Sequence, residues 1–449
     1  MIFAYSLIFL VLATVLFHFL SPWWFTPIAS NWTMMDQTVD LTFWVTGVVF
    51  IAVNLFMAYC VIRYRHRSGI KAHYEPENKK LEWWLTGVTT VGIAALLAPG
   101  LAVWARFVTP PDDATQIEVV GEQWNFSYRF PGRDGVLGTT NIQLASIDNP
   151  FAIDPNDHKG QDDILISSPE LHLPIGKPVK VLMRSKDVLH QFAVPPFRVK
   201  MDMVPGMITY FWFTPTRIGA YDALCEQLCG MAHFTMRGRV VVDTEADFQA
   251  WLARQPTFAT TRAEVAGDVA AGQTAYAICS ACHGAQAEGN PQLNAPKLAG
   301  QASWYLVRQL QNFKQGIRGG GKDTLATQMM PFAATLPDDT AIKNVVAYIA
   351  TLPDTPSSSL VSGSPERGKA IYATCGSCHG GAGQGVWSTN APRLAHMSDW
   401  YMKRQLQNFR DGLRGAHPQD FSGAQMAQMA KALADDQAVD DVLKHIQTF

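Results

Sequence analysis

One short stretch of the sequence brings two thiols, two imidazoles and a thioether close together. Cys225 and Cys229 are followed by His233 and Met236, and His190 lies upstream. These are soft to borderline ligands of the kind that bind copper in electron-transfer sites. A mononuclear blue-copper site needs one cysteine, so two cysteines favour two copper ions bridged by both sulfurs. A tetrahedral zinc site could use the same cysteines and histidines, but it would leave Met236 unexplained.

Two further pairs of cysteines each have a histidine directly after them. The motifs are Cys279-Ser-Ala-Cys282-His283 and Cys375-Gly-Ser-Cys378-His379. This C-x-x-C-H spacing is typical of covalent attachment of a c-type heme. In such a site both cysteines form thioethers with the heme and the histidine binds the iron. The sequence therefore predicts two covalently bound hemes c.

An internal repeat supports both heme motifs. Cys375 follows Cys279 by 96 residues, and the same offset relates Trp304 to Trp400 and residues 309–313 to residues 405–409. Self-similarity at a fixed offset indicates a repeated structural unit. We therefore expect two copies of one heme module.

The sixth iron ligand is expected to be a methionine, because a thioether raises the iron potential relative to a second histidine. The first copy offers Met329 and Met330, and the second offers Met426 and Met429. Met329 and Met426 each lie seven residues before a leucine, so the alignment of the two copies favours this pair. Met330 and Met429 are then expected to pack against heme or core.

Three apolar runs at the start of the chain predict a membrane anchor. They cover about residues 1–20, 41–62 and 81–104, and about 20 helical residues span a bilayer. The first run could be a signal peptide, but its length and its lack of a positive start favour a retained helix. The loop after the second run carries six Lys and Arg, which the positive-inside rule places in the cytoplasm. The larger part of the chain then lies outside.

Composition changes along the chain suggest four units. Short β-rich stretches with Pro and Gly between them run from about residue 116 to 244 and predict an all-β sandwich or barrel, and the sequence then becomes Ala-rich and helical. The expected units are 1–108, 109–245, 246–353 and 354–449. Lys plus Arg number 36 and Asp plus Glu 38, so no basic excess suggests binding to nucleic acid.

The sequence from the second apolar run to about residue 242 resembles the binuclear CuA domain of cytochrome c oxidase subunit II. Residues 77–82, 121–128 and 186–195 carry this resemblance together with the cysteine, histidine and methionine pattern. It implies a cupredoxin-like sandwich with a binuclear copper centre. The implied ligands are His190, Cys225, Cys229, His233, Met236 and the backbone carbonyl of Gln227. Many family members have a glutamate at that last position that also contacts magnesium, so a magnesium site stays open here.

Further roles are implied by the same resemblance. Trp124 matches a tryptophan where electrons enter from cytochrome c, and the alternative is a core residue of the sandwich. Glu82 matches a glutamate at a proton-channel entrance, although it could be an ordinary charge at a helix end. The helical units resemble class I cytochromes c, and the pair resembles diheme cytochromes of the c4 type. In that family, prolines at the positions of Pro296 and Pro392 support the axial histidines.

The sequence thus predicts a multidomain protein with N-terminal transmembrane helices, a cupredoxin-like β-sandwich and two all-α class I cytochrome c domains. The expected function is that of a terminal oxidase subunit, which passes electrons through two hemes c and CuA to subunit I for reduction of O2. The expected partners are subunit I, other membrane subunits, lipid, and cytochrome c or a quinol–cytochrome c reductase complex. The expected location is the bacterial inner membrane, multi-pass, with the CuA and heme domains on the periplasmic side. A CuA-type nitric oxide reductase subunit and a membrane-anchored electron shuttle are the alternatives.

Overall fold

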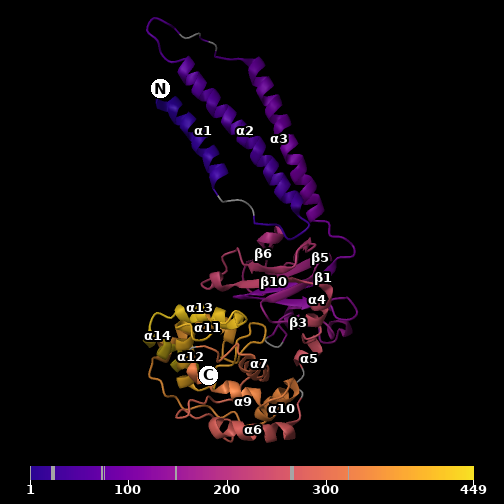
Figure 1. The fold of residues 1–449 in the computed structure, drawn as a ribbon, viewed down its shortest axis with the longest axis vertical. Coiled ribbons are helices and arrows are strands. Elements are labelled where there is room, and N and C mark those ends of the chain that lie inside the picture. Colours follow the sequence, from indigo (N-terminus) through magenta and orange to yellow (C-terminus); the bar gives the residue numbers. More distant parts are fainter. Residues whose placement is uncertain are drawn as a thin grey trace.

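The computed structural model describes residues 2–21, 26–71, 74, 76–146, 149–262, 267–321 and 323–449. Three long helices form one end of the molecule, a β-sandwich lies in the middle, and two helical modules form the other end (Figure 1). This arrangement confirms the multidomain fold expected from the sequence.

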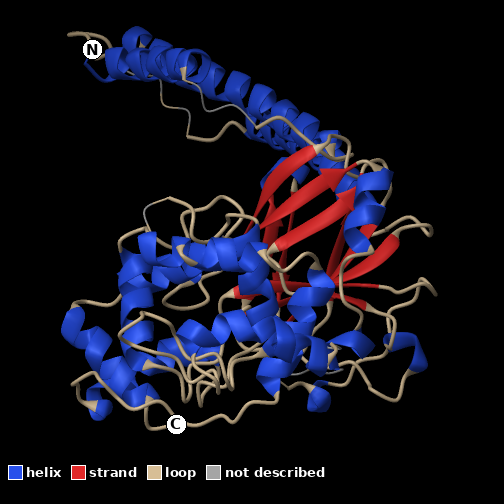
Figure 2. Cartoon of the chain, turned by 60° about the horizontal axis from the view of Figure 1, so that its bottom comes forward, coloured by secondary structure: helices blue, strands red, loops and turns tan. Residues whose placement is uncertain are grey.

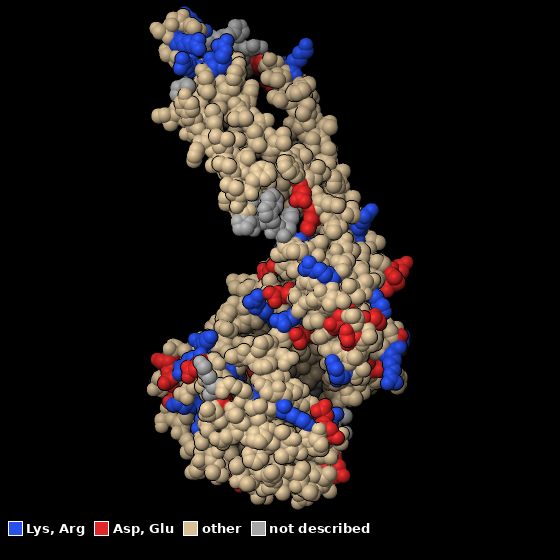
Figure 3. Space-filling model, in the orientation of Figure 1, with Lys and Arg blue, Asp and Glu red and all other residues tan. Residues whose placement is uncertain are grey.

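The three long helices are α1 (Ile2–Leu20), α2 (Thr33–Arg63) and α3 (Lys79–Phe107). Each is long and apolar enough to cross a membrane. Their surface carries almost no charged side chains, whereas Lys and Arg gather at the end far from the sandwich (Figure 3). That end holds the loop between α2 and α3. The helices therefore form a membrane anchor whose basic loop points away from the rest of the chain.

Two five-stranded sheets make up the sandwich. The first has the order β3 (Ile164–Ile166), β2 (Asn125–Phe130), β1 (Thr115–Glu122), β5 (Val179–Ser185) and β8 (Thr209–Phe213). The second has the order β4 (Glu170–Pro174), β10 (Arg237–Asp243), β9 (Gly219–Leu224), β6 (His190–Val194) and β7 (Val199–Met203). Short 3-10 helices lie in the connections: η1 (Ile142–Leu144), η2 (His158–Gly160), η3 (Pro195–Phe197) and η4 (His233–Thr235).

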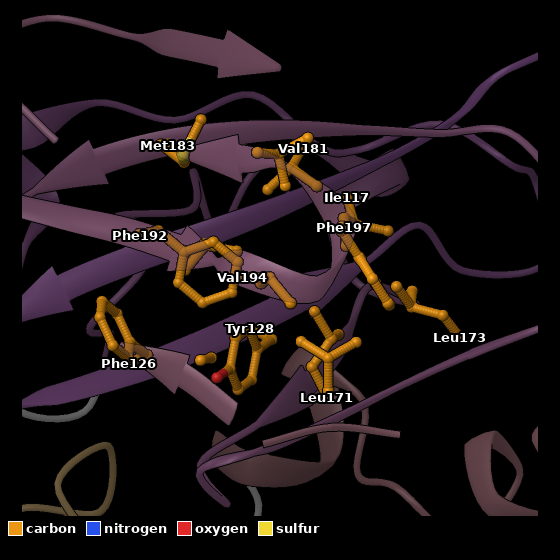
Figure 4. Packing of buried hydrophobic residues seen from close by; sticks show 14 of the residues in the cluster. Ile117, Phe126, Tyr128, Leu171, Leu173, Val181, Met183, Phe192, Val194 and Phe197 are labelled. Carbon is orange, nitrogen blue, oxygen red and sulfur yellow. The ribbon is translucent and has the colours of Figure 1, made fainter. Parts of the chain in front are cut away.

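Side chains from both sheets form the core of the sandwich. Alternate residues of β5 point inward, so Val179, Val181 and Met183 are buried while the residues between them are partly exposed. Phe126 of the first sheet meets Phe192 of the second with ring centroids 5.1 Å apart (Figure 4). Each fully buried side chain of this size contributes about 1.5–3 kcal/mol.

The membrane helices are joined firmly to the sandwich. Trp32, just before α2, is buried in the sandwich core and donates its indole N–H to the carbonyl of Trp212 at 2.9 Å. Trp212 in turn donates to the carbonyl of Arg106 near the end of α3 at 3.0 Å. An ion pair of 2.6 Å links Arg198 to Asp36 of α2. The orientation of the sandwich relative to the anchor is thus fixed by packing and hydrogen bonds.

Two short helices follow the last strand and lie on the sandwich. They are α4 (Glu245–Leu252) and α5 (Phe258–Arg262). Phe248 belongs to the main core, and Phe258 packs against Phe151 and Leu165. The unit boundary proposed from the sequence at residue 245 falls on the first residue of α4, and in the structure both helices pack with the β-sheets.

The two remaining parts are helical and have matching elements. The first contains α6 (Val269–His283), α7 (Ser303–Lys314), α8 (Thr324–Thr327), α9 (Met329–Ala334) and α10 (Asp339–Ala350). The second contains α11 (Pro365–His379), α12 (Asp399–Arg410), α13 (Phe421–Lys431) and α14 (Asp436–Ile446). Asp338 and Asp435 cap the last helices, each accepting from a backbone N–H at 2.8 Å.

In each module the first and last helices cross at very short distance. A Cβ on Gly272 would lie 2.0 Å from the carbonyl oxygen of Asn344, and a Cβ on Gly368 would lie 2.0 Å from that of Asp441. Only glycine allows this approach of two backbones. The crossing holds α6 and α11 in place, and each of these helices ends in a heme motif.

The second module lies nearer to the sandwich than the bulk of the first. In Figure 1 the yellow helices α11 and α13 are next to the β-strands, whereas α6 and α10 of the first module are farthest from the membrane helices. Both modules gather on the side of the sandwich away from the anchor (Figure 2).

Candidate functional site

The residues predicted to bind copper meet at one edge of the second sheet. His190 is the first residue of β6, and Cys225 directly follows β9, which pairs with β6. The loop from Cys225 to Met236 then returns to β10, the other neighbour of β9. Strand pairing therefore brings together residues that are up to 46 positions apart in the sequence.

The donor atoms of this loop lie within a few ångströms of one another. The Cys229 sulfur is 3.8 Å from that of Cys225, 3.4 Å from Nδ1 of His233 and 3.8 Å from the sulfur of Met236. The backbone carbonyl oxygen of Gln227 is 3.3 Å from the Cys225 sulfur. The structure thus brings together the sulfur, imidazole and carbonyl donors of this loop that were predicted from the sequence.

His190 completes the cluster. Ligand atoms of His190, Cys225 and Cys229 all lie within 4.8 Å of one another, and all three residues are buried. Nδ1 of His190 is buried without a hydrogen-bond partner among the described residues, whereas its Nε2 lies 2.7 Å from a carboxylate oxygen of Asp187. One ring nitrogen held by a carboxylate and the other left open is the usual state of a metal-binding histidine.

The charges of the two thiols also fit a metal. Burial, together with the negative charge of Cys225, raises the pKa of the Cys229 thiol to about 12. Two ionised sulfurs at this distance need a positive charge between them, and metal ions would supply it. The thioether of Met236 within the cluster suits copper better than zinc. The donor set therefore fits a copper centre.

Gln123 and Gly230 lie beside the cluster, although no sequence motif selects them as site residues. The Gln123 side-chain amide donates to the Cys229 carbonyl at 2.6 Å, and the Trp124 indole N–H donates to the same oxygen at 3.2 Å. A Cβ on Gly230, whose φ is +124°, would lie 2.7 Å from the Gln123 amide nitrogen. The glycine thus makes room for Gln123, which only the fold could reveal.

Each heme motif lies at the C-terminal end of a long helix. His283 ends α6 and His379 ends α11, and each helix is followed by a glycine with a φ of +84°. Nδ1 of each histidine donates to a proline carbonyl at 2.8 Å, that of Pro296 or Pro392. Burial lowers the pKa of both histidines, which keeps the imidazoles neutral. Nε2 of each ring is then free to bind iron.

A cavity of about 640 Å³ extends through both helical modules. Cys279 and His283 line it from the first module, and Cys375 and His379 line it from the second. Its other lining residues include Met329, Met426, Met429 and the guanidinium-bearing Arg308, Arg318 and Arg414. Heme carries two carboxylates, for which arginine is a suitable partner. The cavity and its lining fit two covalently held hemes.

The methionine alternatives occupy different surroundings. Met329 lines the cavity, whereas Met330 packs beside Gly319, with its Cγ 3.0 Å from where a Cβ would lie. Met426 and Met429 both line the cavity, and Met426 packs with Phe409 whereas Met429 also contacts the sandwich core. The cavity lining thus favours Met329 over Met330, and the choice of Met329 and Met426 as ligands stays a prediction.

Trp124 and Glu82 lie in very different places. Trp124 is buried and directly contacts the loop from Cys225 to Met236, called the copper loop below. Glu82 is exposed in the first turn of α3, near the basic loop and far from the sandwich. The roles of both residues remain predictions.

Comparisons with known proteins match this architecture. The family described as the periplasmic domain of cytochrome c oxidase subunit II matches residues 115–244, and the cytochrome c family matches residues 269–353 and 365–449. The alternative cytochrome c oxidase subunit 2 of Bradyrhizobium diazoefficiens is 58% identical over 256 residues, which cover 57% of this chain and 92% of that protein.

Two other relatives point the same way. The cytochrome c oxidase subunit 2 of Thermostichus vulcanus is 43% identical over 251 residues, covering 51% of this chain and 76% of that protein. Cytochrome c4 of Azotobacter vinelandii is 33% identical over 170 residues, covering 34% of this chain and 78% of that protein.

The fold and the site define a membrane-anchored electron-transfer protein. The chain belongs to the cytochrome c oxidase subunit 2 family and is thus a subunit of an oxidoreductase, with two cytochrome c domains at its C-terminal end.

Proposed function

We propose that this chain is the subunit that receives electrons in a membrane-bound heme–copper terminal oxidase. It takes electrons from a c-type donor and passes them through two hemes c and a binuclear CuA centre to the heme of subunit I, where O2 is reduced to water. When bound, the copper pair and each heme iron would accept and release one electron.

The observation that carries this proposal is the cluster of donor atoms on the sandwich. The two cysteine sulfurs lie 3.8 Å apart, and imidazole, thioether and carbonyl donors surround them, supplied by His190, His233, Met236 and Gln227. These residues would hold the copper ions, which would supply one-electron transfer when bound. Two covalent hemes are supported by the hydrogen bonds of the axial histidines to proline carbonyls and by the cavity in the helical modules. One heme would be bound by Cys279, Cys282 and His283 and the other by Cys375, Cys378 and His379. Met329 and Met426 would be the sixth ligands.

The membrane helices support an assembly with subunit I in the bacterial inner membrane. The basic loop between α2 and α3 favours a cytoplasmic position, which puts the sandwich and both heme modules on the periplasmic side. Glu82 lies on the cytoplasmic side in this orientation, where a proton channel would begin.

The test is oxygen uptake by the chain purified with its native partners in mild detergent. We expect fast, cyanide-sensitive uptake from a reduced c-type donor. An intact preparation with all its copper and heme but no uptake would contradict the oxidase assignment. Reduction of nitric oxide by that preparation would then identify the nitric oxide reductase alternative, and purification of the chain without partners would identify the shuttle.

A further inference from the structure

The contacts between the second heme module and the copper loop indicate an order for the two hemes. We propose that the second module delivers electrons to the copper cluster through Gln123, and that the first module accepts them from the external donor. This inference rests on the proposed function, because it assumes that both motifs and the cluster carry their metals.

Cys378 of the second module lies against the sandwich. Its sulfur lies 3.8 Å from the backbone carbonyl oxygen of Gln123. This sulfur would form one of the two thioethers, so it marks the edge of the bound heme. A heme bound at this motif would therefore have its attachment point against the sandwich at Gln123.

Gln123 also contacts one of the predicted copper ligands. Its side-chain amide donates at 2.6 Å to the carbonyl of Cys229, whose own sulfur belongs to the cluster. One residue thus spans the gap between a heme thioether and a copper ligand, with one van der Waals contact and one hydrogen bond. The Trp124 indole bonded to the same carbonyl gives a parallel contact.

Further contacts hold the second module in this position. Asn125 donates to the carbonyl of Ser388 at 2.7 Å, and Gln425 donates to the carbonyl of Trp124 at 2.5 Å. Trp387 packs against a buried cluster of the sandwich that includes Val120. Such packed and hydrogen-bonded contacts indicate a stable docked position rather than a transient encounter.

The docked module covers the tryptophan. Trp124 is only 4% exposed, and its backbone carbonyl is bonded to Gln425 of α13. An external protein cannot reach this face while the second module occupies it. Electrons from outside must therefore enter at a heme, and Trp124 becomes a residue of the internal contact.

The first module is connected to the second. Arg318 of the first donates to the Tyr401 hydroxyl at 2.6 Å, and Arg414 of the second donates to the Tyr305 hydroxyl at 2.9 Å. In the part of the chain that the structure describes, every hydrogen bond found between the sandwich and a helical module involves the second module. The first module is thus farther along the same path.

Each step in this order moves one electron and breaks no bond. An external one-electron donor is oxidised as the first module is reduced, the second module is reduced as the first is reoxidised, and the copper cluster is reduced last. The electron leaves for the oxidised acceptor in subunit I.

The test follows electron arrival by time-resolved spectra after the oxidised complex is mixed with a reduced c-type donor in the absence of O2. We expect Gln123→Ala to slow copper reduction several-fold while both hemes are reduced at the original rates. The matched control is Gln143→Ala, because that glutamine is exposed on the same domain. Redox titration of the copper centre should give nearly the same potential in both variants, which separates a loss of coupling from damage to the site.

Two double variants test the order itself. In Cys375→Ala/Cys378→Ala, we expect the first heme to be reduced normally and the copper to stay oxidised. In Cys279→Ala/Cys282→Ala, the donor should reduce neither the second heme nor the copper, whereas a small chemical reductant should reduce both. Rapid copper reduction by the donor without the second heme would overturn the proposal.

Folding and function are checked separately. Hydrogen exchange of residues 387–390 reports whether the second module is still docked in each variant. If a double variant loses this protection, the result for Gln123→Ala alone decides whether the proposed order holds. Because copper reduction is measured without O2, failure of oxygen uptake would contradict the proposed function and leave the electron order standing.

Discussion

Asp187 holds two residues of the copper region with a single carboxylate. One oxygen lies 2.7 Å from Nε2 of His190, and the other accepts the backbone N–H of Gln123 at 2.7 Å. The proposed copper ligand and the residue that contacts the second heme module are therefore positioned by the same side chain.

We expect Asp187→Asn to weaken copper binding about 10- to 100-fold, the usual cost of removing a partner that orients a metal-binding histidine. An amide keeps the size of the carboxylate but loses its charge. Copper content after dialysis against a graded chelator measures the change. Asp222→Asn is the control, because Asp222 is exposed on β9 and pairs with Arg237 only at 3.5 Å. Equal copper retention in the two variants would contradict the orienting role of Asp187.

The second prediction concerns the two methionines of α13. Met426→His is expected to lower the midpoint potential of the second heme by on the order of 100 mV, because imidazole replaces a thioether at the iron. Met429→Leu keeps the volume and should leave the potential unchanged, at a cost of less than about 1.5 kcal/mol in the free energy of unfolding. Optical redox titration compares them. A shift with Met429→Leu alone would mean that Met429 is the ligand.

The third prediction concerns the contact between the modules. Tyr305→Phe removes the hydroxyl that accepts from Arg414, and we expect it to reduce the free energy of unfolding by about 1.5–3 kcal/mol, the range for hydrogen bonds to charged groups. Chemical denaturation followed by heme absorbance measures this loss. Tyr348→Phe serves for comparison, since no hydrogen bond of its hydroxyl is found among the described residues. Similar losses in the two variants would show that the cross-module bond contributes nothing.

The fourth prediction is a pH dependence at the linker between the modules. Burial alone would raise the pKa of Asp354, but Lys297, His396 and Arg393 outweigh it and lower the pKa to about 2. Because this value is below the ordinary 3.8, the stabilisation is complete above pH 3.8 and is lost as the pH falls through about 2. Asp354→Asn should remove that part of the acid dependence. Hydrogen exchange of residues 354–359 across this window provides the measurement, and an unchanged profile in the variant would exclude the ion pairs as its cause.

The sequence was most informative where chemistry depends on short spacing. The two C-x-x-C-H motifs and the loop from Cys225 to Met236 keep their ligands within a turn or a short loop, so residue types alone indicate what they bind. The spacing of seven residues to the following leucine also favours Met329 over Met330, and this assignment stays a prediction. Local spacing of this kind predicts both the modules and their chemistry.

The contacts of the second module with the sandwich could not be predicted in this way. Gln123 and Cys378 are 255 positions apart, and neither belongs to a pattern that suggests the other. Their contact depends on how two separately folded units dock, which is decided by surface shape and by residues such as Trp387. Asp187 was visible three residues before His190, but only the structure shows that its second oxygen binds Gln123.

The length of α2 has a mechanical consequence. Its 31 residues extend about 46 Å, well beyond a hydrocarbon core of about 30 Å, and the residue before it is Trp32, buried in the sandwich. The sandwich is therefore connected to the membrane by a rigid helix rather than by a flexible linker. The height of the candidate copper site above the lipid surface is set by the length of the helices. Because α2 and α3 are both bonded to the sandwich, one extra turn in each would lift the site by about 5.4 Å from any acceptor embedded in the bilayer.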